Sequence, residues 1–414
     1  MENPKIRFKG FTKDWEQRKL SEITTMHARI GWQNLRTSEF LDSGDYMLIT
    51  GTDFNDGAIN YSTCHFVERE RYEQDKHIQI KNGSILITKD GTLGKVAYVQ
   101  GLSMPATLNA GVFNVEIKDE TEVNDKYLFQ YLKAPFLMDY VNKKATGGTI
   151  KHLNQNILVD FPVFMPSKAE QEEIGTYFEK LDNLITLHQR KCEQTKKLKK
   201  YMLQKMFPRN GAKVPEIRFY GFTYDWEQRK LIDYLEVSSE KNRDNRFTKE
   251  DVLSVSGEYG IVNQIEFQGR SFAGASVSNY GVVENGDVVY TKSPLKSNPY
   301  GIIKTNKGIP GIVSTLYAVY KPKEITDSKF VQIYFELDSR MNSYMHPLVN
   351  KGAKNDMKVS AENALKGMVS FPKKDEQEMI SLYFSTIDHL ITLHQRKCDE
   401  LKKMKKYMLQ NMFI

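Results

Sequence analysis

Apolar and small polar side chains recur every three or four residues along two long stretches of the chain. In residues 168–207, which contain no proline, these positions are Ile174, Phe178, Leu181, Ile185, His188 and Cys192. The same steps recur in the last forty or so residues at Ile380, Phe384, Ile387, Ile391, His394 and Cys398. This spacing is typical of a coiled-coil seam. Each stretch therefore predicts a helix of over thirty residues, roughly 50 Å long at ~1.5 Å per residue.

Charge is segregated along the first of these predicted helices. Acidic residues such as Glu170 and Asp182 come first, and bases such as Lys196 and Lys205 come last. This order suits the helix dipole, and it favours antiparallel pairing because the acidic start of one helix then meets the basic end of the other. The bases either contact phosphate or form a solvated face. We expect the following apolar residues to extend the two seams: Leu198, Met202 and Met206 in the first, and Met404, Met408 and Met412 in the second.

Short β-rich runs broken by Gly, Asp and Asn occupy the rest of each half. The first half contains "YMLIT", "SILIT", "KVAYV" and "GVFNVEI", and the second contains "DVLSV", "GDVVYT", "YGIIK" and "TLYAVY". Runs of this kind predict strands. Residues 125–143 and 327–345 resemble each other as helices near the end of each half. Each half therefore predicts a mixed α/β domain.

Internal repeats divide the chain into two halves. "IRFKGFTKDWEQRKL" at 6–20 recurs as "IRFYGFTYDWEQRKL" at 217–231, and "LITLHQRKC" occurs at both 184–192 and 390–398. "KKYMLQKMF" at the end of the first half returns as "KKYMLQNMF" at the end of the second. Between these shared ends the halves differ in sequence, although "ILITKDGTLGKVAYV" can be aligned with "VVYTKSPLKSNPYGIIK". Two long repeats exclude a solenoid, which needs at least three short ones.

These patterns predict an α+β fold with a pseudo-twofold arrangement. Two mixed α/β domains are separated and joined by two long helices that form an antiparallel coiled coil. The Pro- and Gly-containing segment "PRNGAKVPE" is the expected joint between the halves. The predicted boundaries are 1–165 for the first domain, 166–209 for the first long helix and linker, 210–371 for the second domain, and 372–414 for the second long helix.

Composition places the chain among globular proteins of a reducing compartment. It is 40% hydrophobic and 27% charged, with a net charge of +7 and a pI near 8.9. No apolar run approaches the ~20 residues of a membrane helix, and "MENPKIRFKG" has no apolar signal core. The three cysteines cannot all pair, and no CxxC occurs. We expect a cytoplasmic protein without a membrane partner. The mild positive charge is compatible with a polyanion partner.

A search for catalytic motifs finds none that fits. "KDGTLGKV" lacks the first Gly and the final Ser/Thr of a phosphate-binding P-loop. "SNPYG" lacks the second proline of the Asn-Pro-Pro-aromatic tetrapeptide of adenine methyltransferases. His188 and His394 each precede a cysteine by four residues. The two His-Cys pairs could bind a metal if they met, or the histidines could set the register of the helix pair. The second interpretation is favoured. We expect no catalytic residues, no metal site and no cofactor in this chain.

A duplicated frame with unlike inserts favours DNA recognition. Proteins of twofold symmetry read half-sites about one helical turn apart, ~34–36 Å. A helical spacer of roughly 50 Å is of the right scale to hold two such readers. Unlike inserts predict unlike half-sites, so the target is expected to be bipartite and asymmetric. Lys and Arg would contact phosphates, and polar loop residues would read base edges.

The chain resembles, over its whole length, the specificity subunit of type I restriction–modification systems. The resemblance rests on the duplicated "DWEQRKL" openings and on the Pro-x-x-x-Glu-Gln entries at 166–171 and 372–377. It also rests on "LITKDGTLGKVAYV", on "GGTIKHLNQNILVDFPVFMP", and on "SSEKNRDNRF" with "YGVVENGDVVYTKSP". Residues 350–366 depart from the family pattern because they lack a "GGTIKHLN" motif.

The resemblance implies a non-catalytic subunit with two target-recognition domains, each reading one half of a split site in double-stranded DNA. It implies that the helices set the gap and help to hold two modification subunits, which carry S-adenosylmethionine and methylate adenine. Motor–nuclease subunits using ATP and Mg²⁺ would join for cleavage. Two alternatives stay open: a stand-alone DNA-binding regulator, and a coiled-coil scaffold without nucleic acid.

Polar loops beside the predicted strands supply the candidate DNA contacts. Each candidate is a polar or basic residue, in a loop beside a strand or after a helix, that would contact a phosphate or a base edge. The set is Lys89, Thr92, Lys95, Lys151, His152, Lys292, Lys296, Lys351 and Lys354.

Overall fold

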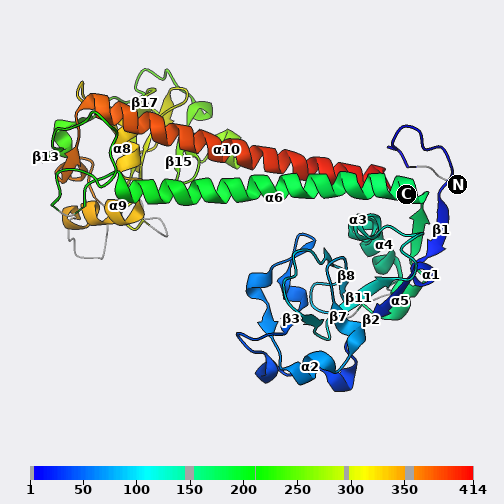
Figure 1. The fold of residues 1–414 in the computed structure, drawn as a ribbon. Coiled ribbons are helices and arrows are strands. Elements are labelled where there is room, and N and C mark those ends of the chain that lie inside the picture. Colours follow the sequence, from blue (N-terminus) through cyan, green and yellow to red (C-terminus); the bar gives the residue numbers. More distant parts are fainter. Residues whose placement is uncertain (1–3, 145–152, 210, 293–297, 350–358, 414) are drawn as a thin grey trace. The chain divides into compact units, whose positions relative to one another are not determined.

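The computed structural model describes residues 4–144, 153–209, 211–292, 298–349 and 359–413 (Figure 1). The chain divides into two compact units. Unit 1 comprises Met1–Gln189 with Arg396–Ile414, and unit 2 comprises Arg190–Gln395. The long helices α6 (Lys168–Lys205) and α10 (Lys374–Asn411) each contribute one part to each unit.

Unit 1 contains a four-stranded antiparallel sheet in the order β2-β11-β8-β9 and a mixed four-stranded sheet in the order β6-β3-β10-β7. Strand β1 pairs with β12, and β4 pairs with β5. Its strands are β1 (Glu16–Lys19), β2 (Thr24–His27), β3 (Met47–Ile49), β4 (Phe54–Asn55), β5 (Ala58–Ile59), β6 (His65–Phe66), β7 (Gln79–Ile80), β8 (Ile85–Thr88), β9 (Val96–Tyr98), β10 (Ala106–Leu108), β11 (Val112–Ile117) and β12 (Pro162–Met165). Its shorter helices are α1 (Leu20–Ile23), α2 (Arg69–Glu73), α3 (Asp125–Lys133), α4 (Pro135–Lys144) and α5 (Gln155–Val159).

Unit 2 repeats the main sheet of unit 1 as β14-β21-β18-β19, also antiparallel throughout. The remaining strands form the pairs β13–β22, β15–β16 and β17–β20. Its strands are β13 (Glu227–Lys230), β14 (Leu235–Val237), β15 (Leu253–Ser256), β16 (Gly260–Asn263), β17 (Gly281–Val283), β18 (Val288–Thr291), β19 (Ile303–Thr305), β20 (Gly311–Val313), β21 (Tyr317–Pro322) and β22 (Met368–Phe371). Its shorter helices are α7 (Gln264–Gln268), α8 (Ser328–Tyr334) and α9 (Asp338–Met345). All eight predicted β-rich runs contain a strand.

One helix was predicted near the end of each half, and in each place the structure has two shorter helices. Residues 125–143 form α3 and α4, which are separated at Ala134. The reason is Pro135, because the residue before a proline is disfavoured in the α region. Residues 327–345 form α8 and α9, with α8 ending at a C-cap on Phe335. The prediction of a single helix in each place was therefore wrong.

The long helices pair in antiparallel fashion, as contacts inside each unit show. In unit 1 the Phe413 ring, just after α10, stacks on Phe178 near the start of α6, with ring centroids 5.7 Å apart. In unit 2 the last part of α6 lies instead against the first half of α10, where Lys199 pairs with Asp388 at 2.6 Å. Each helix has 38 residues, or about 57 Å at ~1.5 Å per residue. The predicted α+β fold with an antiparallel helix pair is confirmed.

Most of the predicted seam and its extension is enclosed: Met206 and Met412 are buried, and Met202 and Met408 are half-buried. Nine of the twelve seam residues are buried, and His188, Ile391 and His394 are half-buried. Beyond them, Leu198 and Met404 are 47% and 45% exposed, so they do not extend the seam. Steps of three and four from each cysteine land instead on Lys199 and Lys405, whose side chains are largely enclosed.

The repeated opening and the Glu-Gln entries meet at the start of each long helix. Arg7 donates two hydrogen bonds to Glu170, at 2.7 and 2.8 Å. Arg218 does the same to Glu376 in unit 2, at 2.7 Å for each bond. The next residue, Gln171 or Gln377, accepts a hydrogen bond from the backbone N–H of the residue that caps α3 or α8. These duplicated bonds fix each long helix to its own domain in the same way.

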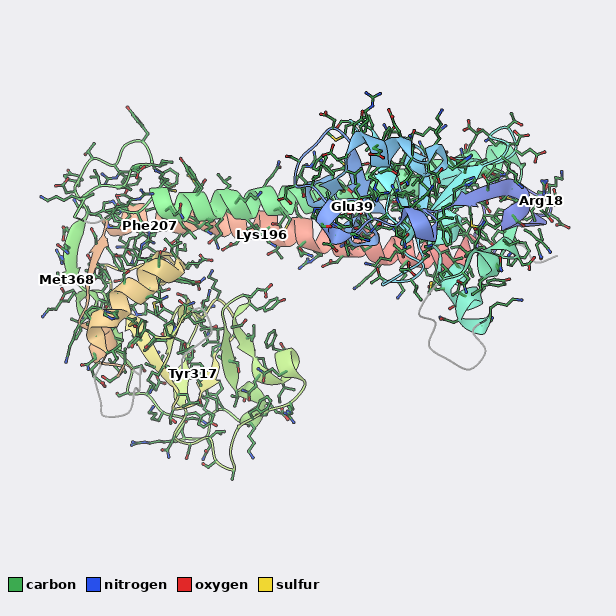
Figure 2. All side chains as sticks on the ribbon, turned by 90° about the horizontal axis from the view of Figure 1, so that it is seen from below. Arg18, Glu39, Lys196, Phe207, Tyr317 and Met368 are labelled. Carbon is green, nitrogen blue, oxygen red and sulfur yellow. The ribbon has the colours of Figure 1, made fainter. Side chains whose placement is uncertain are left out.

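Aromatic residues close each core at a repeated position. Phe207, labelled in Figure 2, lies just after α6 and is 1% exposed. It packs edge-on against Trp226 in unit 2, and the Arg340 guanidinium lies 4.4 Å from its ring centroid. Phe413 holds the same place in the core of unit 1, among Phe178, Tyr127 and Tyr131. Each domain core is therefore completed by residues that follow a long helix.

Candidate nucleic-acid interface

In unit 1 a tight turn projects from the main sheet between β8 and β9. The Thr88 hydroxyl accepts a hydrogen bond from the Lys95 backbone N–H at 2.9 Å, and it donates to the Thr92 carbonyl. Gly94 has φ of +68°, and a Cβ there would lie 2.1 Å from the Met138 sulfur. The turn therefore requires glycine at this place. Thr92 and Lys95 are exposed on it.

Unit 2 builds the corresponding loop from the same parts. Thr291 accepts a hydrogen bond at its hydroxyl from the Ile302 backbone N–H, at 2.9 Å. Gly301, the residue before Ile302, has φ of +85°, and a Cβ there would lie 1.8 Å from the Thr291 carbonyl oxygen. The alignment of "ILITKDGTLGKVAYV" with "VVYTKSPLKSNPYGIIK" is thus confirmed. The loop of unit 2 is longer by four residues between the threonine and the residue that bonds its hydroxyl.

Two of the predicted contact residues hold equivalent places in the two units. Lys89 follows Thr88, and its backbone N–H donates to the Gly111 carbonyl at the start of β11. Lys292 follows Thr291, and its N–H donates to the Leu316 carbonyl just before β21. The Lys89 ammonium lies 5.5 Å from the Phe113 ring centroid. Both lysines are half-buried at the base of their loops.

Lys292 lies near charges of both signs. Burial lowers its pKa, the charge of Lys241 lowers it further, and the charge of Glu362 raises it. A bound phosphate would offset the two lowering effects, since an anion favours the charged form of a lysine.

The other predicted contacts lie outside the described residues. These are Lys151, His152, Lys296, Lys351 and Lys354. The described residue Leu153 donates its backbone N–H to the Lys89 carbonyl at 2.8 Å. Leu153 therefore lies at the base of the β8–β9 turn.

Sequence reasoning missed two exposed bases in unit 2, Lys241 and Arg243. They flank Asn242, which is fully buried and holds a compact loop by bonding both the N–H and the C=O of Phe247. The charge of Lys241 acts on Lys292, whose pKa it lowers. The density of bases and asparagines in "KNRDNR" was the signal available in the sequence.

The long helices expose the same apolar set in both units. Unit 1 presents Leu184, Leu187, Met404 and Tyr407, each at least 43% exposed. Unit 2 presents the repeat equivalents Leu390, Leu393, Leu198 and Tyr201, each at least 40% exposed. Within each helix these positions fall within one sector of about 100°, the width of an apolar stripe on an amphipathic helix. Exposed apolar stripes of this kind mark interaction sites.

Comparison with known proteins finds similarity to one family. Residues 12–197 match the family model described as the type I restriction modification DNA specificity domain. The chain is 24% identical to the putative type I restriction enzyme MjaX specificity subunit of Methanocaldococcus jannaschii, over 96% of this chain and 92% of that protein. It is 23% identical to the MjaVIII specificity subunit of the same organism, over 81% of this chain and 79% of that protein.

The fold is also that of a solved structure. The crystal structure of the type I restriction–modification system S subunit from M. genitalium matches with a TM-score of 0.63 and 15% identity, covering 100% of this chain and 99% of that chain. Among the described residues no helix is both long enough and apolar enough to span a bilayer.

Proposed function

The chain belongs, through residues 12–197, to the type I restriction–modification DNA specificity domain family, and from this premise we propose that it reads an asymmetric, bipartite site in double-stranded DNA. Each unit would read one half-site. Partner subunits would then methylate adenine or cleave, so that this chain directs their activity without catalysing either reaction.

One observation carries the proposal. The two units build the same antiparallel sheet, and between its last two strands each has a loop in which a lysine, Lys89 or Lys292, follows an anchoring threonine. The loops themselves differ in length and sequence. A common scaffold with unlike loops is what two different half-sites would require, because phosphate contacts position a protein while base contacts specify the sequence.

The repeated apolar sets on the long helices support two copies of one partner. Because each unit exposes the same four positions, a partner that fits one set also fits the other. We propose that these partners are two modification subunits, which would carry S-adenosylmethionine. Motor–nuclease subunits using ATP and Mg²⁺ would join the complex for cleavage. The assembly would work in the cytoplasm, on the cell's DNA.

Exchange of one insert tests the proposal. Replacing residues 20–160 with the corresponding insert of another specificity subunit should change only one half of the methylated site. Methylation-sensitive sequencing of DNA from cells that also express the modification subunit measures the outcome. A chain that binds the site with nanomolar affinity and needs no modification subunit would instead indicate a stand-alone regulator. Binding that does not weaken with salt would exclude phosphate contacts and with them the proposal.

Lengthening both helices tests their role as a spacer. Inserting four residues, close to one helical turn, after Gln189 and after Gln395 adds ~6 Å to each helix. We expect the gap between the half-sites to widen by one or two base pairs, since base pairs are ~3.4 Å apart, while both half-sites keep their sequences. The same sequencing measures the gap. A methylated site with the original gap would show that the helices do not set it.

A further inference from the structure

Three side chains of unit 1 that are far apart in the sequence meet on one face of its main sheet. His27 on β2 lies directly opposite Asn114 on β11, and Glu116 is two residues further along β11 on the same face. His77 comes from the short 3-10 helix Lys76–Ile78, which approaches this face. The His27 and His77 rings are 4.5 Å apart at 20°. The His27 Nε2 lies 3.8 Å from a Glu116 carboxylate oxygen.

Buried Asn114 fixes two of the three residues. Its side-chain N–H₂ donates to the other Glu116 carboxylate oxygen at 3.0 Å and to the His77 backbone carbonyl at 3.1 Å. Asn114 is 1% exposed, so the sheet itself holds this amide in place. An outer hydrogen bond of this kind orients a ligating carboxylate and raises metal affinity.

The donor set and its spacing suit one class of ligand. One donor atom from each of the three residues can be chosen so that all lie within 4.8 Å of one another. Tetrahedral zinc, with bonds of ~2.0–2.2 Å, needs donor atoms about 3.4 Å apart. Since His27 is only half-buried and the other two are exposed, rotation of the side chains can close this difference. Two imidazoles and one carboxylate favour zinc and similar transition metals over Ca²⁺ or Mg²⁺, which take oxygen ligands.

We propose that unit 1 binds one divalent transition-metal ion of the zinc class through His27, His77 and Glu116, with water in the remaining position. The ion would tie β2, β11 and the 3-10 helix together. Because β11 also pairs with β8, it would stiffen the sheet from which the β8–β9 turn projects. The inference goes beyond the proposed function and does not depend on it, since it concerns ion binding alone.

Calorimetric titration of the full chain with Zn²⁺, untagged and with its cysteines reduced, tests the site. We expect one equivalent to bind with micromolar affinity, and hydrogen exchange in residues 24–27 and 112–117 to slow on binding. His77→Gln should weaken binding at least tenfold. Glu116→Gln should do the same, and it keeps an acceptor for Asn114, so a loss of affinity there cannot come from misfolding of the sheet.

His65→Gln is the matched control, because His65 is a half-buried histidine of the same unit outside the cluster. It should bind Zn²⁺ like the unsubstituted chain. The proposal is overturned if the chain binds no Zn²⁺, or if His77→Gln and Glu116→Gln bind it as tightly as the control does.

Discussion

Replacing Phe413 by alanine should destabilise unit 1 by about 3–5 kcal/mol and leave unit 2 unchanged, and Phe207→Ala should do the reverse. Each ring is almost fully buried. The Phe413 ring stacks on Phe178 and lies 5.4 Å from Tyr131, edge-on. Truncation therefore leaves a cavity among rings that the backbone holds in place. Phe207→Ala should cost at the upper end of this range, because Arg340 also loses the aromatic face beneath its guanidinium.

Hydrogen exchange of core amides, read separately in the two units, measures this pair of effects. Tyr407→Ala and Tyr201→Ala are the matched controls, since these rings lie on the same helices but are 56% and 49% exposed. Each should change stability by less than about 0.5 kcal/mol, as is usual for surface substitutions. Equal loss of protection in both units after Phe413→Ala would contradict the assignment of that ring to the core of unit 1. In the proposed function, each variant should also lose recognition of one half-site before the other.

The duplicated elements at the start and end of each half could be predicted because their sequences occur twice. In the duplicated opening, Arg7 and Arg218 precede a tryptophan by the same number of residues. The duplicated Glu-Gln entries supply their partners. A repeat shows which residues belong together without showing how they touch. The bidentate bonds to Glu170 and Glu376 needed the structure, because those residues lie over 150 positions away from the arginines.

Two of the six residues predicted to extend the seams, Leu198 and Met404, were predicted wrongly for a physical reason. Periodicity searches favour apolar letters, so Leu198 and Met404 were preferred to the lysines that follow them. Lys199 and Lys405 occupy the seam because acidic partners lie within 2.7 Å of each ammonium. A charge can be buried when it is paired, and that pairing is a tertiary fact that single-sequence periodicity does not contain.

The candidate interface was predictable only in part. Lys89 and Lys292 were found because each follows a strand that the β-pattern marks. Lys241 was missed because its charge acts on Lys292 only after the sheet forms. The cluster of His27, His77 and Glu116 depends on strand register, since a shift of one residue would turn His27 or Glu116 to the other face.

Glu336→Lys should destabilise unit 2 by about 3–5 kcal/mol at neutral pH, the range for breaking a buried ion pair. The Lys199 ammonium lies 2.5 Å from Glu336 and 2.6 Å from Asp388, and its side chain is 12% exposed. Buried Lys304 also faces this cluster: burial lowers its pKa, and Glu336 raises it. The substitution removes a shared acid and adds a fourth cation beside Lys199, Lys304 and Lys307. Glu336→Gln is the control, and it should cost less because Lys199 keeps Asp388 and gains no positive neighbour.

Unit 1 already carries the arrangement that Glu336→Lys would create. Glu336 is nine residues after Asp327, the cap of α8, and Lys133 is nine residues after Asn124, the cap of α3. Lys405, the repeat equivalent of Lys199, pairs with Asp182 at 2.6 Å. Burial first, and then the charge of Lys133, lower the pKa of Lys405 to about 8, whereas the two acids hold the pKa of Lys199 above its ordinary value despite burial.

The opposite shifts give the two units opposite dependence on alkaline pH. Between about pH 8 and the ordinary lysine value of 10.5, the unfolded state holds a proton on Lys405 that the folded state has released, so the contribution of Lys405 to the stability of unit 1 rises with pH. Lys199 contributes stability that is constant below pH 10.5 and is lost as pH rises through its raised pKa.

In Glu336→Lys the pKa of Lys199 should fall below 10.5. The difference in unit 2 stability between variant and unsubstituted chain should then shrink from pH 7 to pH 9.5. Hydrogen exchange at the two pH values measures it, and a difference that grows with pH would show that Glu336 does not control the charge of Lys199.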